Sequence, residues 1–222
     1  SFISFSKNVG KKLKNSTNKE VLSLFHPIND DLPNKISKDE ALSNLDLPSR
    51  KYILFIGLIR KYKGVESLIK AFHYASKEHE NLKLIIAGEF YDDINIYKRL
   101  IKRKDLEDKV IIDNDFLKSS KIRDYICISD LIIQPYKKAS QSGITPLAYY
   151  YDKPLVVSNI EGLKEIIIED QSGEIYSETP ANMAIAIKNC INPESNRTYS
   201  NNIAKSKLKY SWLRFVKKVE AF

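Results

Sequence analysis

Short runs of aliphatic and β-branched residues alternate along the chain with windows in which apolar residues recur every three or four positions. The runs are apolar almost throughout, which is typical of strands buried on both faces of a parallel sheet. Between the first two runs, the apolar residues from Val65 to Ala75 fall on one face of a helix. The pattern predicts an α/β fold, with a parallel sheet flanked by helices. The predicted strands are residues 52–57, 82–88, 110–113, 131–134 and 154–158.

Two later helices are marked by their first residues. Thr179 and Asn192 each precede a proline, and a capping side chain before a proline at the first helical position predicts helix starts at Pro180 and Pro193. Residues 212–222 predict a short amphipathic helix whose aromatic side chains need a packing partner.

The first fifty residues differ from the rest of the chain. They contain a short apolar start, several lysines, and a polar stretch punctuated by Pro27, Pro33 and Pro48. Such a segment predicts a connector that enters a domain at about Arg50. A length of 222 residues allows one compact core plus an appendage, at about 100 to 200 residues per domain.

Composition excludes several classes of protein. Hydrophobic residues make up 43% and charged residues 29%, which is ordinary for a globular chain and excludes a disordered or collagen-like one. No apolar run approaches the roughly 18 to 20 residues that span a bilayer, and the start of the chain lacks the pattern of a signal peptide. Cys127 and Cys190 form neither a disulfide framework nor a metal-ligand spacing. These features favour a reducing cytoplasm.

The segment from Gly57 to Gly64 carries the first candidate chemistry. It follows a predicted strand and precedes a helix, the place where open α/β sheets bind ligands and where helix N–H groups meet anions. Gly57 and Gly64 permit close backbone approach, and Arg60 and Lys63 supply charge for a phosphate or diphosphate. A glycine turn with two solvated basic residues is the alternative, because the spacing matches neither common Gly-rich nucleotide motif.

A second candidate segment follows the fourth predicted strand. Small hydroxyl and glycine residues precede a helix predicted over residues 145–151, and such a segment can form a second anion cradle in which Ser142 and Thr145 add hydroxyl donors. Taken alone, simple capping of the helix explains these residues better than an anion cradle does.

The order and spacing of these segments resemble a known family. The runs FIGLIRKYKGVESLIKAF, LKLIIAGE, ISDLIIQPY and SGITPLAYYYDKPLVVSNIEGLKEII resemble, in this order, the C-terminal half of the group 1 (family 4) retaining glycosyltransferases of the GT-B fold. The resemblance covers roughly residues 50–215, and His26-Pro27 resembles the interdomain connector of a bacterial branch of that family.

The resemblance implies half of an enzyme. It implies that residues 50–222 form a Rossmann-like domain with C-terminal helices that binds a nucleotide-diphosphate sugar, without a metal or other cofactor. Residues 1–49 are then the remnant of an N-terminal domain and the connector, and the missing domain binds a saccharide or lipid-linked acceptor. On this basis the fragment binds donor without turning it over.

The resemblance also assigns roles to residues. Lys63 aligns with the lysine of the family's KG motif, and Arg60 serves as its arginine partner, although in many relatives the arginine directly follows the glycine, where this chain has Leu58. These two residues are the expected catalytic pair, assisted by the dipole of the helix behind Ser142. The expected donor-binding residues are Gly57, Ser140, Gln141, Ser142, Gly143, Thr145, Phe116 and Leu117.

The absence of the family's E-x7-E motif weakens this assignment. The two glutamates of the family's E-x7-E motif fall at Ser140 and Ala148, so both carboxylates are missing. A degenerate, non-catalytic sugar-nucleotide-binding module is therefore the first alternative.

Asp113-Asn114-Asp115 has the D-x-D pattern that holds Mg²⁺ or Mn²⁺ in other proteins. We expect no metal there, because acidic pairs after strands are common loop residues.

We therefore predict the donor-binding domain of a cytoplasmic bacterial hexosyltransferase that builds a polysaccharide or glycolipid, with peripheral membrane association of the full-length protein. Lys and Arg number 36 against 28 Asp and Glu, a formal charge of +8, which motivates a second alternative, a basic nucleic-acid-binding domain. Because the positive charge is spread along the chain, we expect no nucleic-acid partner.

Overall fold

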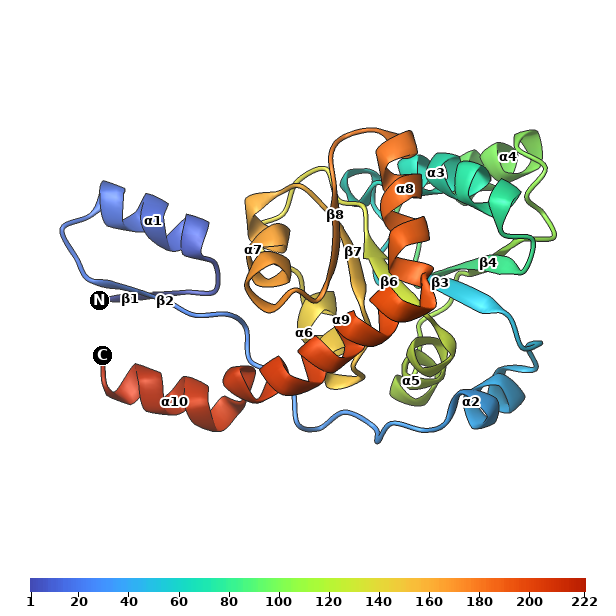
Figure 1. Ribbon diagram of the computed structural model, residues 1–222. Helices are drawn as coiled ribbons and strands as arrows, with labels where there is room; N and C mark the ends of the chain where they lie inside the picture. The colour runs from blue at the N-terminus through green and yellow to red at the C-terminus, as the bar shows by residue number, and fades with distance from the viewer.

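The computed structural model describes all 222 residues. Figure 1 shows a main body built on one sheet and a smaller unit beside it that contains the N-terminus. The sheet has six parallel strands in the order β5-β4-β3-β6-β7-β8. The strands are β3 (Lys51–Ile56), β4 (Leu82–Ala87), β5 (Val110–Asp113), β6 (Leu131–Gln134), β7 (Leu155–Ser158) and β8 (Gly173–Tyr176).

Helices cover both faces of this sheet. Successive strands run outward from β3 in one direction and from β6 in the other, and because parallel crossovers are right-handed, the helices after β3 and β4 lie on the face opposite those after β6 and β7. The helices of the body are α2 (Lys38–Leu45), α3 (Val65–Glu78), α4 (Ile94–Arg103), α5 (Ser119–Ile128), α6 (Ile144–Tyr150), α7 (Glu161–Asp170), α8 (Pro180–Ile191) and α9 (Pro193–Ser206).

The body has a single hydrophobic core. Fifty-one buried hydrophobic residues form one cluster, in which Tyr52, Phe55 and Phe72 are among the largest fully buried side chains. The predicted α/β fold and all five predicted strands are confirmed, each strand within one residue of its predicted bounds. The sixth strand, β8, was missed because it is a four-residue edge strand that begins with glycine.

The predicted helix starts at Pro180 and Pro193 are also confirmed. The Thr179 hydroxyl accepts a hydrogen bond from the Asn182 N–H (3.1 Å), and the Asn192 side chain accepts from the Glu194 N–H (3.0 Å). Cys127 and Cys190 are buried, free thiols in helices. Helix α2 was not predicted: it lies in the stretch interpreted as connector and packs against α5.

The N-terminal unit is a small parallel pair of strands, β1 (Phe2–Ser4) and β2 (Val21–Ser23), joined by helix α1 (Lys7–Ser16). The C-terminal helix α10 (Trp212–Glu220) lies beside it. Phe215 of α10 stacks on Phe5 with ring centroids 5.8 Å apart, which is the packing partner that the aromatic residues of the tail required. No helix of the protein has the length and apolar character needed to cross a membrane.

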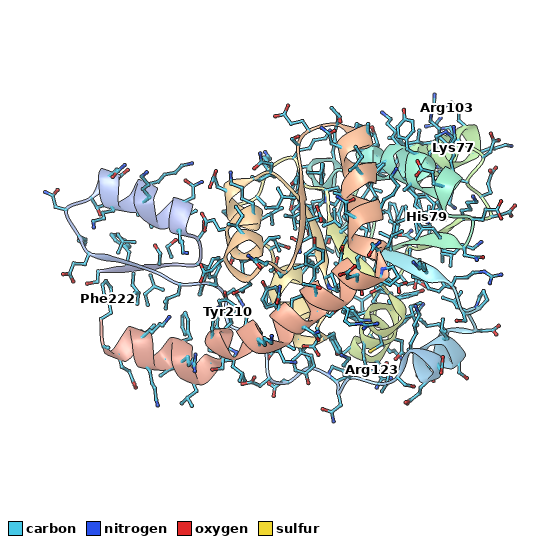
Figure 2. The ribbon with its side chains drawn as sticks, viewed as in Figure 1. Lys77, His79, Arg103, Arg123, Tyr210 and Phe222 are labelled. Atoms are coloured by element: carbon cyan, nitrogen blue, oxygen red, sulfur yellow. The ribbon has the colours of Figure 1, made fainter.

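A short 3-10 turn, η2 (Lys207–Tyr210), joins α9 to α10. Figure 2 shows Tyr210 where the C-terminal helices pass from the body toward the N-terminal unit. Its hydroxyl donates to the buried carboxylate of Asp170 (2.7 Å), and its ring meets Phe25 edge-on at 5.7 Å. Tyr210 therefore connects the end of α7 to the segment that follows β2.

Candidate functional site

The two predicted anion-binding segments lie at one place in the fold. Strand β3 pairs with β4 on one side and β6 on the other, so the strand order reverses between β3 and β6. Residues 57–64 leave the carboxyl end of β3, and residues 135–143 leave the carboxyl end of β6. The crevice between such loops is where open α/β sheets bind ligands.

The two loops interlock at Gly64. This glycine has φ +74°, and a Cβ built on it would lie 1.8 Å from the Pro135 carbonyl oxygen. Close by, the Lys137 N–H donates to the Tyr62 carbonyl at 2.7 Å. Only glycine fits here, because a side chain would be both strained and obstructed. The close backbone approach predicted for Gly64 is therefore an approach to the second loop.

Lys63 points across the crevice. Its Nζ lies 3.9 Å from the centroid of the Tyr136 ring, a cation–π contact. Lys63 is half-buried, and its pKa is lowered from the ordinary value, mainly by burial; the Tyr62 hydroxyl opposes this shift and the Arg60 guanidinium adds to it. A desolvated ammonium gains more from an anionic ligand than one in water does.

Tyr136 continues the contact to Ser142. The tyrosine is 3% exposed, and its hydroxyl lies 3.3 Å from the Ser142 Oγ. The Ser142 Oγ in turn accepts a hydrogen bond from the Ile144 N–H at 3.2 Å. Lys63 and Ser142, one from each predicted segment, are thus joined through a single buried side chain.

Arg60 lies elsewhere. Its guanidinium stacks on the Tyr91 ring, 4.6 Å from the centroid, in the loop between β4 and α4. Tyr91 is 60% exposed, and Leu58, where many relatives have the arginine, is also exposed. The two expected catalytic residues therefore rest on different aromatic rings in different surroundings.

The remaining donor-binding candidates of the second segment differ in how exposed their side chains are to solvent. Ser140, Gln141 and Gly143 are exposed, whereas the Thr145 hydroxyl is buried and accepts from the Gln134 side chain at 3.0 Å. Helix α6 has only seven residues, so the dipole expected behind Ser142 is that of two turns. Ala148, at the place of the second family glutamate, is fully buried.

The third predicted contact region follows edge strand β5. Phe116 is 81% exposed, whereas Leu117 is buried. The Asp113 carboxylate accepts from the Tyr125 hydroxyl (2.7 Å) and pairs with Lys121 (2.7 Å). The D-x-D segment gathers no third ligand: nowhere in the protein do three or more His, Cys, Asp or Glu side chains group as a metal site. The Asp113 carboxylate is therefore already engaged by Tyr125 and Lys121.

The structure shows contacts of two further residues, Tyr136 and Glu165, that the sequence did not predict. The bridging position of Tyr136 has a weak signal, an aromatic residue directly after a buried strand and ahead of a serine-rich loop. Glu165 has none. Its carboxylate accepts from the N–H groups of Lys7 and Asn8, each at 3.2 Å, and so caps helix α1 of the N-terminal unit from α7.

Comparison with known proteins supplies the family. The model of the family described as glycosyl transferases group 1 matches residues 37–207. This chain belongs to the group 1 glycosyltransferases. The predicted resemblance is thereby confirmed, and the match begins just before α2 and ends in η2.

Several relatives show how much of a group 1 glycosyltransferase the chain represents. It is 30% identical over 171 residues to an uncharacterized glycosyltransferase of Methanocaldococcus jannaschii, covering 73% of this chain and 42% of that protein. It is 26% identical over 178 residues to alpha-D-kanosaminyltransferase of Streptomyces kanamyceticus, covering 78% and 45%. The chain thus spans about half the length of the curated relatives that it matches.

Solved structures share the fold. Sucrose-phosphate synthase of Thermosynechococcus elongatus superposes with a TM-score of 0.83 at 17% identity, covering 99% of this chain and 56% of that one. HepE of Anabaena, solved in complex with UDP and glucose, superposes with a TM-score of 0.77 at 16% identity, covering 99% and 61%. The N-terminal unit and α10 are included in both coverages, so their arrangement belongs to the shared fold.

Proposed function

We propose that this chain is the donor-binding part of a retaining glycosyltransferase, and that the crevice between β3 and β6 holds the diphosphate of a nucleotide sugar. The observation that carries the proposal is the convergence of Lys63 and Ser142 through Tyr136 at the point where the strand order reverses. A cation and a hydroxyl donor facing one crevice are suited to a diphosphate.

The chemistry of such a transfer explains why the charge matters. When the bond between the anomeric carbon and the diphosphate breaks, negative charge grows on the leaving oxygen, and a fixed cation stabilises that charge. Lys63 supplies the ammonium, and Ser142 supplies a hydroxyl donor. Arg60, on the exposed Tyr91 ring, contributes a longer-range charge, and the exposed Phe116 ring offers a surface on which a nucleobase stacks.

The acceptor side is assigned to sequence outside this chain. The curated relatives are about twice as long, and we propose that a polysaccharide or glycolipid acceptor binds to that additional part, so that the 222 residues alone bind donor without transferring its sugar. We further propose a hexosyl donor, and a cytoplasmic enzyme that works at the inner face of the membrane. The crystal structure of HepE in complex with UDP and glucose supports a nucleoside diphosphate as the leaving group.

Calorimetric titration with UDP, GDP, ADP and CMP tests the donor site. The expected result is selective binding of one nucleoside diphosphate, weak or no binding of CMP, and the same affinity with and without Mg²⁺, because no metal ligands gather at the crevice. Absence of binding by all four nucleotides would overturn the donor-site proposal. Binding that requires Mg²⁺ would overturn the assignment of the charge to Lys63.

A second candidate function is favoured by one specific observation. At the two positions of the family glutamates the chain has exposed Ser140 and buried Ala148, so no carboxylate holds the ribose or the sugar. This favours a non-catalytic module that binds a sugar nucleotide. An assay of the full-length protein separates the two: release of nucleoside diphosphate from the selected sugar nucleotide supports the enzyme, and tight binding without any release supports the module.

A further inference from the structure

Tyr136 contacts both sides of the crevice. The Lys63 ammonium lies over its ring, 3.9 Å from the centroid, and its hydroxyl lies 3.3 Å from the Ser142 Oγ. The residue is buried, although it lies in the loop directly after β6. A buried tyrosine with a charged group on its face and a polar partner at its hydroxyl is fixed at both ends.

The backbone around Tyr136 is fixed as well. The Ser158 hydroxyl donates to the Tyr136 carbonyl at 2.7 Å, which ties the loop to the end of β7. On the other side, the Gly64 backbone lies against the Pro135 carbonyl. Because the backbone on both sides of Tyr136 is held, the ring gives the Lys63 ammonium a fixed surface on which to rest.

The hydrogen bonds hold the Ser142 hydroxyl in place. Its Oγ accepts from the Ile144 N–H at 3.2 Å. The same Oγ lies 3.3 Å from the Tyr136 hydroxyl, in a hydrogen bond in which either hydroxyl can donate. The Ser142 Oγ is thus held both by the start of α6 and by Tyr136.

We infer that Tyr136 is a positioning residue of the donor site, which holds the Lys63 ammonium on its ring and the Ser142 hydroxyl beside its own, so that both face the diphosphate. This inference rests on the proposed donor site. It assigns Tyr136 no contact with the ligand of its own: the residue acts through Lys63 and Ser142.

The protonation of the two partners is compatible with this role. Burial raises the pKa of Tyr136 to about 12, with the Ser142 hydrogen bond opposing the shift, so the hydroxyl keeps its proton at any ordinary pH. Burial lowers the pKa of Lys63, and a ring face that attracts a cation offsets part of the cost of keeping the charge away from water.

Two substitutions separate the two contacts. Tyr136→Phe keeps the ring and removes the hydroxyl, and we expect about threefold weaker binding of the nucleoside diphosphate that the wild-type protein selects from UDP, GDP and ADP, the scale of one neutral hydrogen bond. Tyr136→Leu removes the ring too, and we expect about thirtyfold weaker binding, since a desolvated cation–π contact accounts for roughly another tenfold. Tyr74→Leu, an exposed tyrosine of α3, is the matched control.

Double variants show whether Tyr136 acts through its partners. In a Lys63→Ala background, the tenfold difference between the Leu and Phe variants should disappear; in a Ser142→Ala background, the threefold effect of Tyr136→Phe should disappear. A purely structural role would leave both differences intact. Circular dichroism and urea unfolding of each variant identify any that do not fold, and the Phe variants keep the ring and its volume, so their arm of the test stands even if Leu variants unfold.

The outcomes separate the two proposals. A wild-type protein that binds none of the three diphosphates overturns the donor site, and this inference with it. Wild-type binding with unchanged affinity in Tyr136→Leu overturns this inference alone. Differences that persist in the Lys63→Ala and Ser142→Ala backgrounds also overturn it, because Tyr136 would then act on the fold and not on the two side chains.

Discussion

The crevice has two parts that come from the same two loops but differ in how they are held. The inner seam, Lys63, Gly64, Tyr136 and Ser142, is at least half-buried and is joined across the crevice. The outer rim consists of five exposed residues, Leu58, Arg60, Ser140, Gln141 and Gly143. Neighbours in sequence thus end in different environments, and packing across the crevice, not position in a motif, decides which charges are fixed.

The clearest case is the pair of basic residues on aromatic rings. Lys63 rests on a ring that is 3% exposed, and Arg60 rests on a ring that is 60% exposed. A cation–π contact is worth about 0.5 to 1 kcal/mol at an exposed site and about 2 kcal/mol when desolvated. The seam should therefore dominate both stability and binding, and the rim should tolerate change.

The largest effect is expected where the two loops touch. Gly64→Ala places a Cβ 1.8 Å from the Pro135 carbonyl oxygen, at φ +74°, and the strained backbone alone costs about 1 to 3 kcal/mol. We expect the free energy of unfolding to fall by about 3 kcal/mol, because the obstruction adds to the strain. Urea unfolding measures it.

Gly143→Ala is the matched control in the same crevice. A Cβ at Gly143 meets nothing within 4 Å, and its φ of −66° suits any residue. The expected change is within about 0.5 kcal/mol, as for other unobstructed surface positions. If both glycines tolerated alanine equally, the distinction between seam and rim would fail.

The next effect concerns the charge of the seam. Lys63→Ala should weaken binding of the selected nucleoside diphosphate by about 1.5 to 3 kcal/mol, the range for a hydrogen bond to a charged group, and leave the fold intact. Lys61 is an exposed lysine in the 3-10 turn Lys61–Lys63, which also contains Lys63. Lys61→Ala should change affinity by less than about 0.5 kcal/mol. Isothermal titration of both variants gives the comparison, and equal losses would show that only net charge matters.

The pH dependence of binding sharpens the same point. Burial, with the Arg60 charge added and the Tyr62 hydroxyl opposing, lowers the pKa of Lys63, so its ammonium loses its proton at a lower pH than that of an ordinary lysine. Affinity should therefore fall at a pH below the ordinary lysine value of 10.5, while Tyr136, with a pKa of about 12, keeps its proton. Titrations between pH 7.5 and 10 test this. Lys63→Arg, whose guanidinium stays charged, should flatten the profile, and a profile unchanged by that substitution would contradict it.

The sheet was predictable because its signal is local. Five strands show continuous apolar runs, and Thr179 and Asn192 mark helix starts through contacts within three residues. Strand β8 lacks such a signal and is held at the edge by β7. Helix α2 has one in Ser37, whose hydroxyl accepts from the Glu40 N–H at 3.1 Å, and it is also held by its packing on α5. Where an element depends on a distant neighbour, the sequence pattern is too weak to define it.

The site was predictable as a place but not as a set of contacts. Each loop was predicted to bind an anion from its position after a strand, the family resemblance assigned both loops to one donor, and the sheet order brings them together. The partners of individual side chains depend on tertiary distance: Arg60 lies on Tyr91 and Glu165 caps α1, 157 residues away. No spacing rule reaches that far, so residue types were easier to identify than their roles.

The smallest effect is expected for Arg60, and it tests the comparison most directly. Arg60→Ala removes an exposed cation from an exposed ring, and we expect the affinity for the nucleoside diphosphate to fall by less than about 1 kcal/mol, mostly through screened long-range charge. The loss should shrink further at 0.5 M salt, whereas the loss from Lys63→Ala should persist, because salt screens a half-buried charge less. Titration of both variants at low and high salt decides the matter. A salt-resistant loss for Arg60→Ala as large as that for Lys63→Ala would mean that Arg60 leaves Tyr91 when the ligand binds and joins Lys63 on the diphosphate.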